Sequence, residues 1–312
     1  MLARIPTQAQ SDPGMAHAIS NTAVMRQCAR HIAVLALRSL HGELVLYPKP
    51  GLVSLQDNGS HDDMSPETFF RSLFSLRHYF RAIALAGMAQ ALFPVLKQLG
   101  IAAEQRMLNA TGGINTHRGA IFALGMLCAS TGYCLQKNIT ISALSLRAAL
   151  LSQWGSALAG HSLATAAGTD SHGALAARDY AASGAREEAA LGLPSVFEHA
   201  LPRLQKSLAE GRSWQLAQVD SLFCLMAHIS DTNLFHRGGP SGARLVRQLA
   251  QKFLRRGGTA APDWLAQAQA CHQIFMRHRL SPGGAADLLA AACFVHASVQ
   301  SFAFVDDRVE IQ

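Results

Sequence analysis

Apolar residues recur at helical spacing along most of the chain, and this pattern limits the fold more than any single motif does. The first clear example runs from Asn21 to Leu46, where Val24, Cys28 and Ile32 begin an apolar stripe typical of an amphipathic helix. Ala and Leu are frequent throughout, whereas the runs of β-branched residues that strands favour are few. The sequence therefore predicts an all-α fold.

Proline, glycine and polar clusters separate the helical stretches. Tyr47–Gly51 (YPKPG) ends the first helix, and Ser65–Glu67 (SPE) supplies a cap, a first-turn proline and an acidic residue for the next one. We expect helices at 21–46, 66–86, 88–99, 117–136, 140–160, 172–183, 194–209, 213–229, 241–256, 262–279 and 283–304. No repeat or long linker divides them, so we predict one compact helical domain over residues 21–312, preceded by a flexible tail over residues 1–20.

The balance of apolar and charged residues predicts a large buried core. The 312 residues are 49% hydrophobic and 15% charged. Three uncharged stretches, 119–136, 148–169 and 288–305, approach membrane-spanning length, but each contains small or polar residues, so we expect buried central helices and no membrane. The N-terminus has no apolar core after its single Arg, and the six cysteines form no CxxC pair, which favours a cytoplasmic protein with reduced thiols.

The formal net charge of +7 suits an anionic partner. Basic residues are mostly scattered singly, apart from short clusters such as Arg255-Arg256. A nucleic-acid surface usually has a dense basic stripe with aromatic residues between the charges. Nucleic acid is therefore not an expected partner.

Four glycine-bearing segments are predicted to be loops between apolar helices, and each carries charged or amide side chains. They are 48–64, 111–119, 231–239 and 281–287. A capped helix that follows such a loop presents free N–H groups, which favour a phosphate. Ordinary helix capping explains any one loop equally well. Four of them together favour glycine-rich loops that converge on one nucleotide site.

The common nucleotide and zinc motifs are absent from the sequence, which has no P-loop, no GxGxxG and no HExxH. Asp62, Asp63, Glu188, Asp231 and Asp287 are hard oxygen ligands on or beside the loops, and they suit Mg²⁺ that bridges carboxylates and phosphates. A helix cap or a surface charge is the alternative for each. Asp231 and Asp287 are the better candidates, because they interrupt strongly apolar surroundings.

From residue 30 to residue 295 the chain resembles the triphosphoribosyl-dephospho-coenzyme A synthase family. The matching segments are PKPGLV at 48–53, NGSHDDM at 58–64, TGGINTHRGAIFALGML at 111–127, GAREEAALGLP at 184–194, Leu201-Pro202, DTN with RGG at 231–239, and LSPGGAADLL at 280–289. Two residues depart from the family pattern: Glu187 replaces a glycine, and Asp62 stands where Lys is common in the citrate lyase branch. YPKPGLVS and DTNLFHRGG resemble the malonate decarboxylase branch more closely.

The resemblance implies an ATP-dependent transferase. A ribose hydroxyl of 3′-dephospho-coenzyme A would attack the anomeric carbon of ATP, adenine would leave, and the triphosphate would be kept. Such a substitution passes through an oxocarbenium-like state, which calls for a carboxylate near the electrophilic carbon and a base for the hydroxyl. The product would be attached to the acyl-carrier subunit of malonate decarboxylase or citrate lyase. The oligomeric state stays open, with a homodimer as one arrangement.

Each candidate residue has a role under this resemblance. Asp231 or Glu188 is expected to be the base or the oxocarbenium stabiliser, and Asp63 and Asp287 are expected to bind Mg²⁺. The residues expected to bind phosphates or other parts of the substrates are Lys49, His61, Asn115, His117, Arg118, Arg186, Asn233, Arg237, Gly283 and Gly284. The charge of +7 is expected to serve the same polyanionic substrates.

Two other classes of protein fit the same residues. An all-α, Mg²⁺-dependent ribosyl hydrolase would use similar carboxylates with water as the nucleophile. A non-catalytic module that binds a polyanion would need the cations but not the carboxylates.

Overall fold

Every regular element in the computed structural model, which describes residues 13–166 and 184–306, is helical, so the all-α prediction is confirmed for these residues. Helix α1 spans Pro13–Val45 and therefore begins earlier than predicted, inside the segment expected to be a tail. The predicted helix at 172–183 lies outside the described residues.

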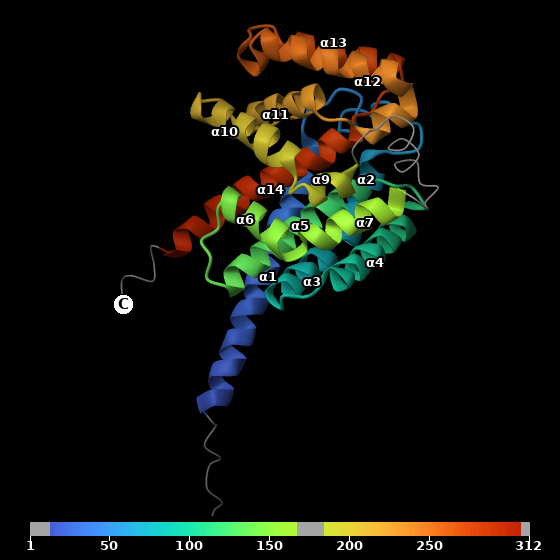
Figure 1. Ribbon diagram of the computed structural model, residues 1–312. Helices are drawn as coiled ribbons and strands as arrows, with labels where there is room; N and C mark the ends of the chain where they lie inside the picture. The colour runs from blue at the N-terminus through green and yellow to red at the C-terminus, as the bar shows by residue number, and fades with distance from the viewer. Residues whose placement is uncertain (1–12, 167–183, 307–312) are drawn as a thin grey trace, which may run out of the picture.

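The other helices pack into a bundle with an additional layer on one side. They are α2 (Pro66–Ser75), α3 (Arg77–Met88), α4 (Phe93–Thr111), α5 (Arg118–Gln136), α6 (Ala143–Leu150), η1 (Leu151–Gly155), α7 (Ser156–Ala166), α9 (Ala185–Ala190), η2 (Ser195–Ala200), α10 (Leu201–Ala209), α11 (Trp214–His228), α12 (Thr232–Arg255), η3 (Gly258–Ala260), α13 (Trp264–Arg277) and α14 (Gly283–Asp306). Figure 1 shows α12 and α13 as a layer beyond α10 and α11, and the first turns of α1 projecting from the opposite end.

Other predicted helices also have different boundaries. The helix expected at 66–86 is divided at Leu76 into α2 and α3. The helix expected at 88–99 is α4, which begins at Phe93 with a proline in its first turn and ends where Gly112 takes a left-handed conformation with φ 68°.

Helices α5 and α14 form the centre of the bundle. Helix α5 contacts α1, α3 and α14. A Cβ atom on Gly132 would lie 2.2 Å from the carbonyl oxygen of Ala84, so this glycine lets α5 and α3 approach closely. Both central helices have the length and apolar character of a membrane span, but 72% of that window is buried in α5 and 61% in α14. Their burial favours the predicted role as core helices.

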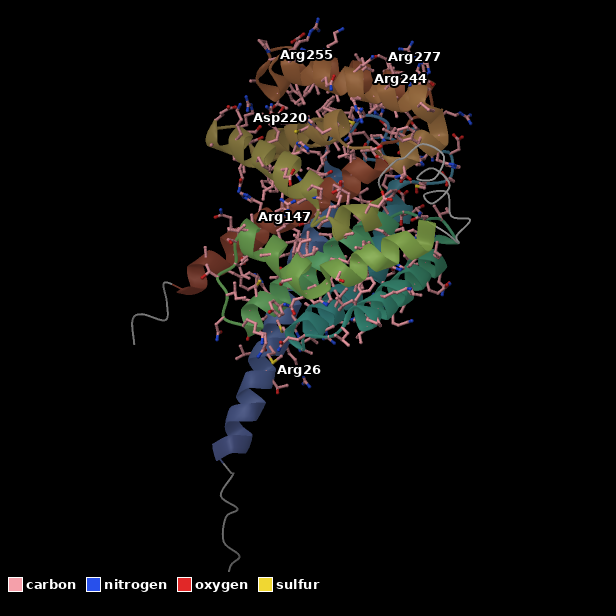
Figure 2. The ribbon with its side chains drawn as sticks, in the orientation of Figure 1. Arg26, Arg147, Asp220, Arg244, Arg255 and Arg277 are labelled. Atoms are coloured by element: carbon pink, nitrogen blue, oxygen red, sulfur yellow. The ribbon has the colours of Figure 1, made fainter. Side chains whose placement is uncertain are left out.

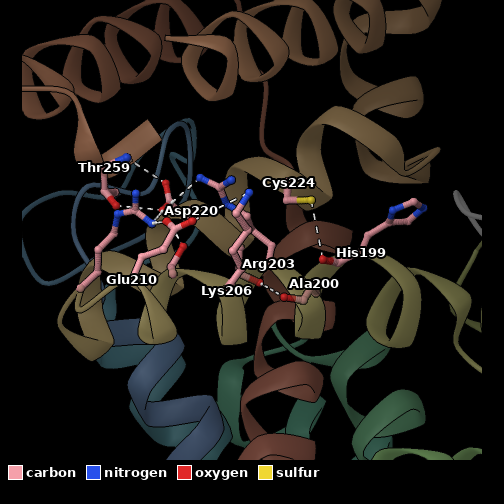
Figure 3. Close-up of polar contacts among 11 residues, drawn as sticks. His199, Ala200, Arg203, Lys206, Glu210, Asp220, Cys224 and Thr259 are labelled. Atoms are coloured by element: carbon pink, nitrogen blue, oxygen red, sulfur yellow. Dashed lines mark hydrogen bonds and ion pairs between the residues drawn. The ribbon is translucent and has the colours of Figure 1, made fainter. Parts of the chain in front are cut away.

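A buried carboxylate connects the bundle to the outer layer. Asp220 on α11 is fully buried and accepts hydrogen bonds from Ser207 Oγ at 2.7 Å and from the backbone N–H and hydroxyl of Thr259, each at 2.9 Å. Arg203 Nη2 lies 3.1 Å from the same carboxylate (Figure 3). These contacts join α10, α11 and the turn between α12 and α13.

Two of the four predicted glycine loops are instead helix starts. The carboxylate of Asp231 accepts a hydrogen bond from Asn233 N at 2.9 Å, and this cap starts α12 at Thr232. This first helical segment breaks at Gly239, whose φ of 58° and ψ of −165° are not helical, and a second segment continues from Pro240 to Arg255. Likewise α14 begins directly at Gly283. Segments 48–64 and 112–117 contain no helix.

Candidate functional site

Predicted catalytic and metal-binding residues line one small cavity. It has a volume of about 40 Å³ and lies where the starts of α9, α12 and α14 face α5. Glu188, Asp231 and Asp287 all line it, together with Gly119 and Gly284. A volume of this size holds an ion or a few water molecules, so a bound nucleotide would extend well beyond it.

Asp231 is held between two helix N-termini. It is 3% exposed, and besides capping α12 it accepts a hydrogen bond from Ala285 N, in the first turn of α14, at 3.2 Å. A Cβ atom on Gly284 would lie 3.0 Å from this carboxyl group, so the glycine permits close approach. Burial raises the pKa of Asp231 to about 6, although the neighbouring backbone N–H groups oppose this shift. A carboxylate with such a pKa is suited to act as a base near neutral pH.

Asp287 lies against the start of α5. A Cβ atom on Gly119 would be 2.2 Å from Asp287 Oδ2, so the carboxyl group packs directly on the glycine backbone. Burial, followed by the carboxylates of Glu43 and Asp231, raises the pKa of Asp287 well above its usual value. This part of the site therefore carries more carboxylate groups than nearby cations neutralise, which suits a bound cation.

Replacing Gly119 with alanine is expected to abolish most of the activity of this site. The new methyl group would overlap Oδ2 of Asp287, so the carboxyl group would have to move from its position in the cavity. Turnover, measured by product release, should fall by about 10²-fold or more. Gly160 is a control, because a Cβ atom there meets nothing within 4 Å. Near-normal turnover of Gly119→Ala would exclude a role for the observed position of Asp287.

Glu188 forms the opposite wall of the cavity. Its carboxylate accepts hydrogen bonds from Ser195 N at 3.2 Å and Ser195 Oγ at 2.6 Å, and burial raises its pKa. Glu187, which departs from the family pattern, accepts a hydrogen bond from Gly184 N at 3.2 Å. It therefore supports the start of α9, and Glu188 keeps its place in the cavity.

Lys49 and His117 are both buried, and neither is a free cation. Lys49 Nζ pairs with Glu43 Oε1 at 2.6 Å, and both side chains are buried. His117 Nδ1 lies 2.6 Å from Ser72 Oγ. Burial, with Lys49 close by, lowers the pKa of His117 to about 3, so the imidazole is neutral at physiological pH. If His117 contacts phosphate, it does so as a neutral hydrogen-bonding group.

Glu43 belongs to this group and was missed in the sequence. It is 4% exposed, it pairs with Lys49, and its charge acts on both Asp287 and Cys293. One signal was present: Glu43 comes three residues after Leu40 and directly before Leu44, so it falls on the apolar stripe of the first helix. An acidic residue in that position is buried and needs a partner.

A second group of predicted residues connects the first loop to α12 and α14. His61 Nε2 lies 2.8 Å from Ser281 Oγ, and Arg237 Nη2 donates to His61 Nδ1 at 2.9 Å. Asn233 packs against Gly283, where a Cβ atom would be 2.9 Å from its amide nitrogen. Asp63 has a side chain that is 57% exposed, and it contacts His61 but does not line the cavity.

The remaining candidates lie at the edge of the site. Arg118 is largely exposed and pairs with Glu104 at 2.6 Å, while Asn115 Oδ1 accepts a hydrogen bond from Arg118 N at 3.2 Å. Arg186 is half-buried, and Glu104 and Arg118 are close enough to influence its pKa. These arginines form a cationic edge next to the starts of α5 and α9.

The structure does not bring Asp63 and Asp287 together as a preformed pair of metal ligands. Within residues 13–166 and 184–306, no three His, Cys, Asp or Glu side chains are grouped closely enough to hold an ion by themselves. The carboxylates of the cavity still fit Mg²⁺, because this ion keeps several waters and commonly needs only one or two carboxylates together with substrate phosphates. Among these carboxylates Asp287 is the best candidate for a Mg²⁺ ligand, because the carboxylates of Glu43 and Asp231 lie close to it.

A larger cavity of about 210 Å³ lies elsewhere in the bundle, between α1, α11 and α14. Its lining includes Arg38, Trp214, Gln218 and Cys293. None of the candidate residues lines it.

Comparison with known proteins identifies the class of this helical protein. The family model for ATP:dephospho-CoA triphosphoribosyl transferases (CitG) matches residues 29–303. Relatives named probable 2-(5''-triphosphoribosyl)-3'-dephosphocoenzyme-A synthase include one from Acinetobacter calcoaceticus, 38% identical over 86% of this chain and 91% of its own length. Another, from Pseudomonas putida, is 42% identical over 86% of this chain and 94% of its own length. No solved structure gives a significant match.

The protein is thus a transferase whose carboxylates meet at the junction of several helix N-termini. It belongs to the triphosphoribosyl-dephospho-coenzyme A synthase family. A relative from Pectobacterium atrosepticum that carries the synthase name is 35% identical over 92% of this chain and 96% of its own length.

Proposed function

We propose that the enzyme transfers the 5-triphosphoribosyl group of ATP to the ribose hydroxyl of 3′-dephospho-coenzyme A at the cavity between α5, α9, α12 and α14, and releases adenine. The observation that carries this proposal is the placement of Glu188, Asp231 and Asp287 around one cavity. A substitution at an anomeric carbon needs a base and a carboxylate that stabilises positive charge, and the three carboxylates of the cavity can supply both.

The three carboxylates receive different roles because their surroundings differ. Asp231, with its pKa of about 6, accepts the proton of the attacking hydroxyl. Glu188, fixed by two hydrogen bonds from Ser195, stabilises the oxocarbenium-like carbon. Asp287 would hold Mg²⁺, which would neutralise charge on the triphosphate. Arg118, Arg186 and Arg237 would contact phosphate oxygens from the edge of the site.

The recipient of the product is proposed to be the acyl-carrier subunit of malonate decarboxylase, in the cytoplasm. Support comes from YPKPGLVS at 47–54 and DTNLFHRGG at 231–239, which resemble this branch more than the citrate lyase branch. Mass analysis of each candidate carrier subunit, after incubation with the product and the attaching transferase, tests the choice. Modification of the citrate lyase carrier alone would reverse it.

The reaction itself is tested with the purified protein, ATP, Mg²⁺ and 3′-dephospho-coenzyme A, followed by liquid chromatography and mass spectrometry. Adenine and the triphosphoribosylated adduct should appear in equal amounts. Adenine with free ribose triphosphate would show a hydrolase instead. Binding of both nucleotides without any adenine would show a module that lacks catalysis.

The pH dependence of kcat/KM should reflect the raised pKa of Asp231. Because the base must be ionised, kcat/KM is expected to fall about tenfold per pH unit below pH 6 and to be level above it. The same shift has the opposite effect on stability. The folded protein holds this proton more tightly than the unfolded chain, so the contribution of Asp231 to stability decreases as the pH rises from about 4 to 6. A rate that stays constant down to pH 4.5 would exclude Asp231 as the base.

A further inference from the structure

The entire net charge of the protein lies on one helical hairpin. Residues 232–279, which comprise α12, α13 and the turn between them, contain eight Lys and Arg residues and one acidic residue, Asp263. The formal charge of this segment is therefore +7, equal to that of the whole chain. The remainder of the protein, with equal numbers of basic and acidic residues, is balanced.

The basic side chains of the hairpin face solvent. Arg244, Lys252, Arg255, Arg256 and Arg277 are all exposed, and Figure 2 shows the three labelled ones, Arg244, Arg255 and Arg277, on the outer layer of the molecule. In the part of the chain that the structure describes, none of the five forms an ion pair with a carboxylate. We refer to these five residues as the basic face.

Much of the basic face is too far from the cavity to bind the substrates. The part of α12 after Pro240 continues to Arg255, a length of roughly 22 Å at 1.5 Å per residue. Exposed charges separated by more than a Debye length, about 8 Å at physiological ionic strength, are largely screened from one another. Lys252, Arg255 and Arg256 lie at the far end of this segment in the outer layer, and none of them lines the cavity.

We propose that the basic face is a docking surface for an acidic protein, namely the acyl-carrier subunit that receives the product. The identity of this partner rests on the proposed function, whereas the surface rests on the distribution of charge. A row of unneutralised cations on a rigid helical pair complements a surface rich in Asp and Glu, and it accelerates encounter with such a partner. Nucleic acid fits less well, because Phe253 and Phe275 of the hairpin are buried and Phe235 and Trp264 are only partly exposed, which leaves little aromatic surface for stacking.

The test compares two triple variants with the same change in charge. One carries Arg244→Glu, Lys252→Glu and Arg255→Glu on the basic face. The other carries Arg26→Glu, Arg30→Glu and Arg81→Glu, which are exposed residues of α1 and α3; Arg26 lies at the opposite end of the molecule (Figure 2). Binding of the purified, fluorescently labelled apo carrier subunit is measured by anisotropy at low and high salt, and adenine release is measured in parallel.

The wild type should bind the carrier, and more weakly at high salt. The basic-face variant should bind about 10- to 100-fold more weakly, the control variant within about twofold of the wild type, and adenine release should be unchanged in both. If carrier binding is weakened equally in both variants, the docking proposal is wrong. It is also wrong if the wild type releases adenine but does not bind the carrier, and in neither case is the proposed function affected. Tighter binding of duplex DNA or phosphatidylserine vesicles than of the carrier would also overturn it. If adenine release fails while the charge-dependent binding remains, the proposed reaction is wrong and the docking surface stands.

Discussion

Asp231→Asn should lower kcat by about 10²- to 10⁴-fold and leave the protein folded. Asparagine is as good a helix cap as aspartate, so its oxygen can still accept the hydrogen bond from Asn233 N, and only the longer bond from Ala285 N to the second carboxylate oxygen is lost. It cannot accept a proton from the attacking hydroxyl. The loss should therefore appear in the chemical step, and the Kd of ATP should change little, which single-turnover measurements of adenine release and nucleotide binding can separate.

A matched control is available at another helix start. Asp263 is the N-cap residue of α13, it is exposed, and it lies in the hairpin rather than in the cavity. Asp263→Asn should have the turnover of the wild type. If Asp231→Asn also retained normal turnover, Asp231 would be a structural cap and the base would have to be sought elsewhere.

Asp220→Asn is expected to destabilise the protein by about 3–5 kcal/mol, the largest effect on stability that the structure predicts. The substitution leaves Arg203 and Arg212, which lie 3.1 Å and 3.6 Å from this carboxylate, without their buried partner. Its amide group would also have to present a donor to a site surrounded by the donors of Thr259. Urea unfolding followed by circular dichroism measures the change.

Glu210→Gln provides the comparison for Asp220. Glu210 also pairs with Arg212, but its side chain is 42% exposed, so its loss should reduce the free energy of unfolding by no more than about 1 kcal/mol. Similar effects of the two substitutions would show that the Asp220 cluster in Figure 3 contributes little through its buried charge.

The helices were largely predictable because long apolar stripes determine both their existence and their burial. The helical start of segment 231–239 was not predictable, because its glycines suggested a loop. Leu280 explains the difference: a Cβ atom on Gly238 would lie 2.4 Å from its side chain, so the glycine provides room for packing within a helix. A residue type alone does not distinguish a glycine that ends a helix from one that lets a neighbour approach.

The sequence allowed the carboxylates of the candidate site to be predicted, but not which of its cations are paired with acidic residues. Asp231 and Asp287 were recognised as acidic residues in apolar surroundings and Glu188 as an oxygen ligand beside a loop, and the structure places all three in one cavity. The pairing of Lys49 with Glu43 was overlooked although the two residues are only six positions apart, because Lys49 was assigned to the phosphates and the buried position of Glu43 on the apolar stripe was not considered. The surface that carries the excess positive charge was not predictable either, because it depends on which face of α12 is exposed to solvent.

The kink at Gly239 and Pro240 divides α12 into two segments that can change independently. The short first segment follows Asp231 and begins with Thr232, which both line the cavity, and the longer second segment carries the exposed arginines. Because the backbone direction changes between them, a substitution on the outer segment need not shift the carboxylates of the cavity. The exposed residues between Ser241 and Arg255 can therefore be exchanged to change the charge of the outer surface without replacing any residue that lines the cavity.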